Sequence, residues 1–328
     1  NADGFKVLIG LPLDTPIDVT ADLTYNPIQI DLNKAIERAL ERLKKQNTIF
    51  EKEGALWFRS SDYGDEKDRV VVRADGIPTY FLADIAYHYH KFQRGFERAI
   101  DFWGPDHHGY IARMQGAMQA LEISPTWLEV QILQHVTFIL DGRPVNMSKR
   151  EGPLITMDAL MEDVGADVAK YFFLTRKPNS QLDFDLDLAK EQSAENPVYY
   201  VKYAHARICS LLSKAEKEGM TTKEPSEKYL EYLDEESEWN LVRELIRLPL
   251  VIVSAAQARE PHRLTAYVYE VAELYHKFYH QCKVLKIMED QPDLAQCRLQ
   301  LSLVTRHVLR VVLDIIGVDA PEVMEEKG

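Results

Sequence analysis

Residues 99–110, Ala-Ile-Asp-Phe-Trp-Gly-Pro-Asp-His-His-Gly-Tyr, contain a short apolar run that stops at a glycine and a proline. The run predicts a buried strand over residues 99–103, and the spacing after it predicts a helix from about Tyr110 to Leu121. A second strand is expected around Val130–His135. The order strand, helix, strand predicts that the two strands are parallel. Residues that directly follow parallel strands lie at the edge of the sheet where α/β folds bind ligands.

The turn after the first strand supplies four candidate binding residues, Gly104, Asp106, His107 and His108. We expect them to contact a nucleotide or an amino acid. A metal site is the alternative, because aspartate and histidine are ligand types, but adjacent histidines point in different directions. A purely structural role, capping of the next helix by Asp106, is compatible with either alternative.

The segments before and after this turn extend the mixed pattern. Apolar spacing predicts a helix over residues 31–45, and β-branched and aromatic runs predict strands at 55–59 and 69–73. Pro78 is expected in the first turn of the next helix. The Asp141-Gly142 pair predicts a hairpin turn.

Strand signals stop after about Gln192, and helical spacing continues to Ile315. The sequence therefore predicts an α/β domain with parallel strands followed by an all-α helical bundle. The expected divisions are residues 1–30, which match no element pattern and stay unplaced, residues 31–191 for the α/β domain, and residues 192–328 for the bundle.

Composition sets limits on the environment and on the partners. The 328 residues carry a net charge of −13, which argues against non-specific binding to nucleic acid but leaves room for one specific, locally basic or aromatic site. No apolar stretch is long enough for a membrane span, and no signal peptide opens the chain. Cys209, Cys282 and Cys297 lack metal spacing, so we expect a reducing cytoplasm and small core side chains.

Residues 145–152, Val-Asn-Met-Ser-Lys-Arg-Glu-Gly, form a candidate catalytic loop. When a carboxylate attacks the α-phosphate of ATP, negative charge builds on the phosphate oxygens and on the departing pyrophosphate. A lysine on a mobile loop stabilises that charge as it develops, and Lys149 is the candidate. Ser148 adds a hydroxyl donor and Arg150 a second cation. Taken alone, a Met-Ser-Lys string also occurs by chance in surface loops.

Tyr80 and Asp84 are four residues apart, so on a helix they share one face. A carboxylate binds a guanidinium through two parallel hydrogen bonds, which an ammonium cannot form, and a tyrosine ring can flank the pair. The alternative for Asp84 is a carboxylate that favours the helix dipole near the N-terminus.

Tyr200, Tyr203 and Arg207 follow at i, i+3 and i+7, which places two rings and a guanidinium on one helical stripe. Such a stripe suits unpaired bases of RNA. Tyrosines at this spacing also pack bundle cores, so for Tyr203 the two alternatives stay open.

Together these segments resemble arginyl-tRNA synthetases of the bacterial type, which belong to class I. Residues 145–152 resemble the family's K-M-S-K-S loop in its M-S-K-R form, with Asn146 where the first lysine is usual. Residues 103–110 resemble its W-G-A-D-H-H-G-Y segment, with Pro105 in place of alanine. Further resemblance lies in residues 76–88, 171–176, 182–190, 196–207 and 315–324, the last with Val323 where arginine is usual.

The resemblance implies the second half of a Rossmann-like catalytic domain followed by an anticodon-binding bundle. It implies ATP-dependent activation of arginine and its transfer to tRNA(Arg), with magnesium, without a tightly bound cofactor or a protein metal site, and with no membrane partner. The implied roles are catalysis for Lys149, Ser148 and Arg150; ATP binding for Gly104, Asp106, His107, His108 and Met147; arginine binding for Tyr80 and Asp84; and anticodon binding for Tyr200, Tyr203, Arg207 and Met324.

The family's His-Ile-Gly-His signature does not occur in these 328 residues, nor does its amino-terminal domain. We therefore expect this chain alone to be inactive in ATP–pyrophosphate exchange. Family members are usually monomeric, but an unpaired sheet edge predicts self-association of this chain. A natural truncated paralogue, acting as a non-catalytic tRNA-binding or regulatory module, is the alternative. A class I ligase for cysteine ranks last, because the zinc-type cysteine spacing is absent.

Overall fold

A computed structural model describes residues 31–145, 156–220 and 231–324 of the chain. The chain forms two compact units, which divide between Gln134 and His135. Each unit has its own hydrophobic core, and each is described by itself below. This division falls within the expected α/β domain, so strands occur in both units.

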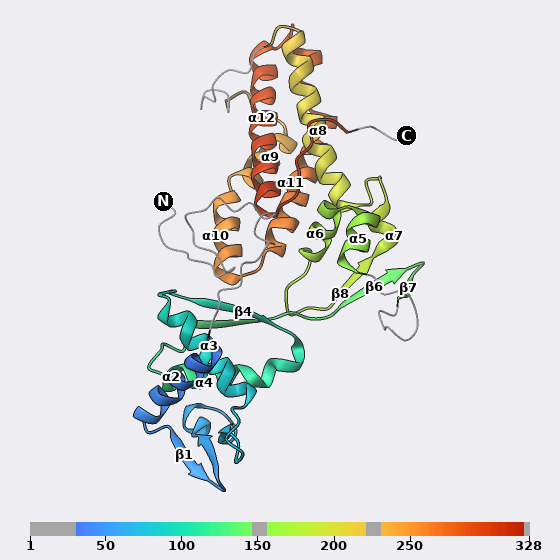
Figure 1. Cartoon of the computed structure of the whole chain (residues 1–328). Helices are drawn as coiled ribbons and strands as arrows, with labels where there is room; N and C mark the ends of the chain where they lie inside the picture. The colour runs from blue at the N-terminus through green and yellow to red at the C-terminus, as the bar shows by residue number, and fades with distance from the viewer. Residues whose placement is uncertain (1–30, 146–155, 221–230, 325–328) are drawn as a thin grey trace. The chain divides into compact units, whose positions relative to one another are not determined.

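The first unit starts with a helix, which is followed along the chain by a small antiparallel sheet (Figure 1). These elements are α2 (Leu32–Lys45), β1 (Ile49–Lys52), β2 (Ala55–Phe58), the 3-10 helix η1 (Ser60–Tyr63) and β3 (Arg69–Val72). The helix and the two strands predicted from the sequence are confirmed. The strands are antiparallel because Glu53 and Gly54, both at positive φ, close β1 onto β2 in a two-residue hairpin.

The remaining elements of the first unit make a parallel pair of strands with helices. They are α3 (Tyr80–Gln93), β4 (Ala99–Trp103), the 3-10 helix η2 (Pro105–Tyr110), α4 (Ile111–Ala120) and β5 (Leu128–Ile132). The predicted parallel pairing is confirmed, with Ala99 opposite Leu128. The second strand begins and ends a few residues earlier than expected.

The predicted place of Pro78 in the first turn of α3 is wrong. Thr79 is the N-cap of α3, and its hydroxyl accepts a hydrogen bond from the Leu82 amide at 3.4 Å. Pro78 lies before the cap and bridges to Val72 of β3. The hydroxyl of Thr79 satisfies an amide at the helix end, so the helix starts at Tyr80 rather than at the proline.

The second unit opens with a three-stranded sheet and three short helices. They are β6 (Val136–Leu140), β7 (Arg143–Pro144), α5 (Met157–Val164), α6 (Ala166–Phe173), β8 (Leu182–Asp185) and α7 (Leu186–Lys190), with β6 between its two neighbours, and α8 follows. The predicted hairpin turn is confirmed, because Asp141 and Gly142 both have positive φ and join β6 to antiparallel β7. β6 and β8 are parallel.

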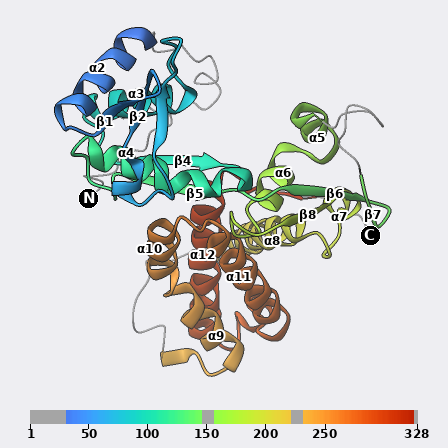
Figure 2. The same cartoon turned by 90° about the horizontal axis from the view of Figure 1, so that it is seen from below.

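In residues 197–220 and 231–324, the elements that the structure describes are all helices (Figure 2). They are α8 (Pro197–Lys217), α9 (Glu236–Leu245), α10 (Leu248–Ala258), α11 (His262–Gln281), the 3-10 helix η4 (Leu285–Ile287) and α12 (Pro292–Ile315). Val201, Val268 and Val312 from three of these helices are fully buried in one core. The predicted helical bundle is therefore confirmed, and its helices fix the spacing of the side chains on their outer faces.

A buried ion pair fastens three parts of the bundle together. Arg298 of α12 donates to Glu238 of α9 at 2.6 Å and to the backbone carbonyl of Lys283 at 3.1 Å. Glu238 is also the partner of the amides of Asp234 and Glu235, so it closes the capping box at the start of α9. Loss of either charge would leave the other buried and unpaired, which is strongly destabilising.

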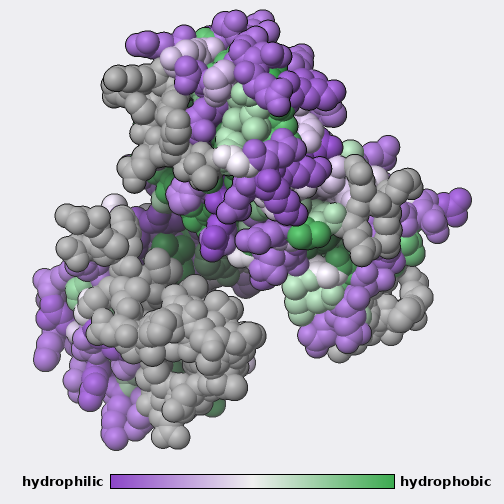
Figure 3. All heavy atoms as spheres, turned by 90° about the horizontal axis from the view of Figure 1, so that it is seen from above, coloured by the Kyte–Doolittle hydropathy of each residue, from purple (hydrophilic) through white to green (hydrophobic). Residues whose placement is uncertain are grey.

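Hydrophilic residues cover most of the described surface in the view of Figure 3, and apolar residues gather in smaller patches between them. In the described ranges, no helix combines the length and the apolar character that a membrane crossing needs. The exposed apolar residues include Leu250, 74% exposed on α10, and Phe102, 64% exposed on β4.

Candidate functional site

The first candidate site lies at the start of α3, where Asp84 meets Tyr110. The hydroxyl of Tyr110, at the end of η2, donates to Asp84 Oδ2 at 2.8 Å. Burial, followed by the hydrogen bond to Asp84, raises the pKa of Tyr110 far above its usual range, so the hydroxyl keeps its proton and stays a donor. Within the described part of the chain, the half-buried Asp84 carboxylate has no cationic partner. It is therefore available to a guanidinium.

A second carboxylate close by is already neutralised. Asp65 accepts two hydrogen bonds of 2.7 Å from Arg69 and one of 3.1 Å from Arg113. The hydrogen bond from Arg69 is the main reason that the pKa of Asp65 lies well below its usual range. The guanidinium of Arg113 also lies 5.0 Å from the centre of the Tyr110 ring. Arg113 thus links the paired Asp65 to the tyrosine that orients Asp84.

Tyr80 has a different environment from Asp84. It is the first residue of α3, and its side chain is 88% exposed. A ring this exposed contributes little to the core, so packing does not explain its presence. Tyr80 and Asp84 lie on the same face of α3, one turn apart, as expected from their spacing.

A buried cluster holds α3 against β4 behind this site. His88 lies with its Nε2 2.6 Å from Asp101 Oδ2, and its Nδ1 lies 2.8 Å from the backbone oxygen of Asp84. Lys91 donates to the other oxygen of Asp101 at 3.0 Å. Burial tends to raise the pKa of Asp101, but His88 and Lys91 outweigh it and lower the pKa to about 2. The cluster fixes the helical turn that carries Asp84.

The four residues after β4 lie where the sequence predicted them. Gly104 has an extended backbone before η2, and Asp106, His107 and His108 are exposed at the carboxyl end of the strand. Asp106 forms no capping hydrogen bond, so the structural alternative for it is wrong. The space beside Gly104 and Gly109 is open, since an added Cβ would meet nothing within 4 Å. A ligand can therefore approach the backbone closely here.

The candidate catalytic residues Ser148, Lys149 and Arg150 lie outside the described residues, and so does Met147, a candidate for ATP binding. Among the residues that are described, no group of three or more histidine, cysteine, aspartate or glutamate side chains could hold a metal ion.

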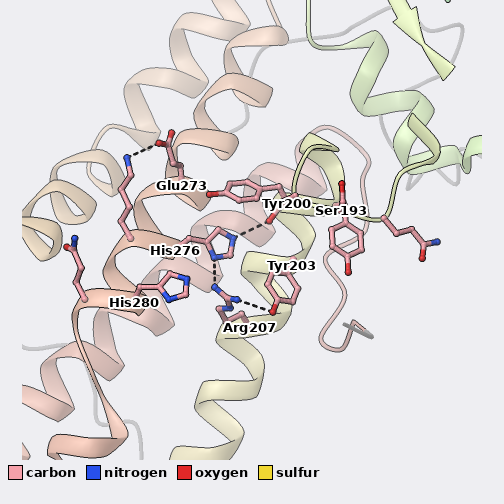
Figure 4. A pocket seen from close by; sticks show the side chains of 12 residues that line it. Ser193, Tyr200, Tyr203, Arg207, Glu273, His276 and His280 are labelled. Atoms are coloured by element: carbon pink, nitrogen blue, oxygen red, sulfur yellow. Dashed lines mark hydrogen bonds and ion pairs between the residues drawn. The ribbon is translucent and has the colours of Figure 1, made fainter. Parts of the chain in front are cut away.

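The second candidate site is an open cavity of about 720 Å³ between α8 and α11 (Figure 4). Tyr200, Tyr203 and Arg207 of α8 line it, together with Glu273, His276 and His280 of α11. The rings of Tyr199 and Tyr203 stack with centres 6.2 Å apart, and Tyr203 stacks on His276 at 5.9 Å. Tyr203 is half-buried, so it both packs and borders the cavity.

Arg207 is held in place from three sides. It donates to the Tyr203 hydroxyl at 3.0 Å and to Nδ1 of His276 at 2.9 Å. Its guanidinium also lies 4.5 Å from the centre of the Tyr203 ring and 4.9 Å from that of Tyr279. Because a guanidinium can only donate, His276 must accept at Nδ1 and carry its proton on Nε2. Burial, with a contribution from Arg207, lowers the pKa of His276 to about 4, which agrees with a neutral ring.

This neutral histidine predicts acid sensitivity of the helical unit. The pKa of His276 falls from its usual 6.5 to about 4 on folding, so between these pH values the unfolded chain holds more protons. The contribution of His276 to the free energy of unfolding should therefore be fully present above pH 6.5. The free energy of unfolding should fall by on the order of 2 kcal/mol as the pH is lowered towards 4. Thermal unfolding, followed by circular dichroism across this range, measures the loss. The variant His276→Asn keeps an acceptor near the position of Nδ1, so the free energy of unfolding should depend less on pH in this variant. An unchanged pH dependence would contradict the assignment of His276 as a buried neutral histidine.

Met324 lies beside a second cavity of about 440 Å³, which is lined by residues of α7 and α8 as well. Gln192 and Tyr199 border both cavities, so Met324 and the Tyr203–Arg207 stripe belong to one continuous surface. The closing segment is fastened to the bundle, because His205 lies 2.8 Å from the carbonyl of Pro321. Tyr200, Tyr203 and Arg207 thus line one cavity, and Met324 lines the neighbouring one.

Two participants were not predicted from the sequence. Tyr110 stands in the 103–110 motif, so its hydroxyl was visible as a candidate, but its partner Asp84 lies 26 residues away. His276 has no motif around it and lies 69 residues from Arg207. The packing of α11 against α8 alone brings it into the site.

Comparison with known proteins identifies both parts of the chain. Residues 28–208 match the family model described as tRNA synthetases class I (R), catalytic domain, and residues 201–324 match the DALR anticodon binding domain. The arginine–tRNA ligase of Moorella thermoacetica is 49% identical over 306 residues, 93% of this chain and 54% of that protein. That of Syntrophotalea carbinolica is 43% identical over 325 residues, 99% of this chain and 58% of that protein. The chain spans about half the length of these curated relatives.

Solved structures agree with these matches. A Campylobacter jejuni protein described as an arginyl-tRNA synthetase superposes with a TM-score of 0.77 at 34% identity, over 89% of this chain and 62% of that one. The arginyl-tRNA synthetase of Thermus thermophilus gives a TM-score of 0.75 at 21% identity, over 90% of this chain and 59% of that one. At this lower identity, the second likeness shows the fold.

Proposed function

Because the chain belongs to the arginyl-tRNA synthetase family, we propose that it takes part in the ATP-dependent activation of arginine and its transfer to tRNA(Arg). In this proposal the first unit binds the amino acid and part of ATP, and the α8–α11 surface binds the anticodon. Lys149, with Ser148 and Arg150, stabilises the charge that develops on the phosphates. Its three cysteines form no disulfide bond, which suits a reducing cytoplasm.

The hydrogen-bonding environment of Asp84 is the observation that supports the binding of arginine. Its carboxylate receives a hydrogen bond from the neutral Tyr110 hydroxyl, while the nearby Asp65 is saturated by two arginines. A guanidinium can form two parallel hydrogen bonds with such a carboxylate, whereas an ammonium contributes a point charge. The site should therefore select arginine over lysine.

ATP would lie at the carboxyl end of β4. The open space beside Gly104 and Gly109 fits a close approach of the phosphates to the backbone, and the exposed His107 and His108 supply donors. Met147 is also proposed to contact the nucleotide. Magnesium enters with ATP, as part of the substrate.

Calorimetric titration of the chain with arginine and with lysine tests this proposal. We expect saturable binding of arginine and at least tenfold weaker binding of lysine, because lysine lacks the fork of donors. Equal affinities for the two amino acids would contradict the assignment of Asp84, and so would undetectable binding of arginine.

We also propose that the chain self-associates. Within residues 31–134, β4 and β5 each have a single neighbouring strand, and Phe102 on β4 is exposed. Unpaired strand edges and exposed apolar side chains promote association. Sedimentation velocity should show a sedimentation coefficient that rises with concentration, and Phe102→Lys should reduce this rise. A concentration-independent monomer would contradict the prediction.

A further inference from the structure

The small antiparallel sheet of the first unit carries aromatic side chains on its outer face, which points away from the hydrophobic core. Phe58 of β2 is fully buried and pairs with Ile49 of β1, so these two side chains face the core. The next pair along, Phe50 and Trp57, points to the opposite face. Both rings are half-buried and lie outside the hydrophobic core, with their centres 6.4 Å apart and a tilt of 25° between them.

Two cations flank these rings. Lys52 Nζ lies 5.5 Å from the centre of the Trp57 ring, and the guanidinium carbon of Arg59 lies 4.7 Å from the centre of the Phe50 ring. Both side chains are exposed, and among the described residues neither has a carboxylate within ion-pair distance.

The face is held in a fixed geometry. The Trp57 indole donates to the backbone oxygen of Lys52 at 3.2 Å, which fixes the ring across the hairpin. The tight turn at Glu53 and Gly54 sets the register that places Phe50 opposite Trp57. Rigid aromatic side chains on a sheet lose little conformational entropy when a ligand stacks on them.

From these observations we propose that the outer face of β1 and β2 binds single-stranded RNA. Unpaired bases stack on aromatic rings and on guanidinium planes, and their phosphates pair with lysine and arginine. A double helix hides the π-faces of its bases, so the proposed ligand is single-stranded. The proposal rests on the proposed function, in which the substrate is an RNA with unpaired nucleotides. It concerns a surface of the first unit, separate in sequence from the α8–α11 cavity.

Fluorescence anisotropy with a labelled single-stranded hexaribonucleotide tests this face. The double variant Lys52→Ala/Arg59→Ala should weaken binding at least tenfold. It should also lower the slope of log affinity against log salt by about 1.4, since each phosphate contact of a single strand contributes about 0.7. Trp57→Leu should weaken binding about tenfold, whereas Trp57→Phe, which keeps a ring, should retain most of it.

The matched control is Lys67→Ala/Arg73→Ala, which removes two exposed cations of the same unit other than the two that lie over the Phe50 and Trp57 rings. It should leave affinity and salt slope close to those of the unchanged chain. Equal losses in the two double variants, or equal binding of single-stranded and double-stranded RNA, would overturn the proposal. Circular dichroism of each variant confirms that it is folded.

A second probe separates this inference from the proposed function. An anticodon stem-loop hairpin of tRNA(Arg) should respond to Arg207→Ala in the cavity and not to the Lys52/Arg59 pair. The hexaribonucleotide should show the reverse. If Arg207→Ala did not weaken binding of the hairpin, the anticodon assignment would be contradicted. If the Lys52/Arg59 double variant did not weaken binding of the hexaribonucleotide, the proposal for the sheet face would be contradicted.

Discussion

Asp84→Asn is expected to lower the affinity of the chain for arginine by roughly 10- to 150-fold. The amide keeps the shape of the carboxylate but loses the charge, and it turns one acceptor into donors that face the donors of the guanidinium. Hydrogen bonds between charged groups contribute about 1.5–3 kcal/mol, which corresponds to this range. Calorimetric titration with arginine measures the loss.

Two further variants make this result specific. Tyr110→Phe removes the hydrogen bond of 2.8 Å that orients the carboxylate, so we expect a smaller loss of about fivefold, or ~1 kcal/mol. Asp62→Asn, at an exposed carboxylate in η1, should leave arginine binding unchanged. If Asp62→Asn weakened binding as much as Asp84→Asn, the effect would come from net charge and the proposed contact would be wrong.

Arg207→Ala is expected to weaken binding of tRNA(Arg) by roughly 10- to 100-fold. The guanidinium is fixed by Tyr203 and His276 at the edge of the cavity, so it offers RNA a donor with little further loss of entropy. Base-specific contacts and stacking each contribute about 1–3 kcal/mol in such sites. Filter binding or anisotropy with the whole tRNA measures the change.

Arg207 also supports the bundle, so stability must be separated from binding. Arg207→Lys keeps the charge but loses the fork that reaches both partners, and it should recover only part of the affinity. Arg243→Ala removes a cation of α9 that does not line the cavity, and we expect it to bind tRNA as the unchanged chain does. An Arg207→Ala variant that is fully folded and binds normally would rule out the contact.

Secondary-structure elements, and residues that share one face of a helix, could be predicted from the sequence because both depend on the spacing of nearby residues. The helix over residues 31–45, the strand over 99–103 and the Asp141-Gly142 turn follow from apolar periodicity and from backbone preferences of single residues. The same periodicity placed Tyr200, Tyr203 and Arg207 on one face of α8. Each of these predictions needed information from fewer than about twenty neighbouring residues.

The partners of these residues could not be predicted in the same way. His276 reaches Arg207 only because α11 packs along α8, and Tyr110 reaches Asp84 only because η2 folds back towards α3. The aromatic face of Phe50 and Trp57 likewise depends on strand register across a hairpin. Contacts between distant segments are set by packing, and a single sequence carries no direct record of them.

The most direct test of the anticodon assignment is a double-mutant cycle between Arg207 and the anticodon. The chain and its Arg207→Ala variant are each titrated with tRNA(Arg) and with the same tRNA carrying a replaced anticodon. If the α8–α11 surface binds the anticodon, either change alone should cost most of the affinity, and the second change should add little to the first. Strictly additive losses would contradict the assignment, as would binding that ignores the anticodon.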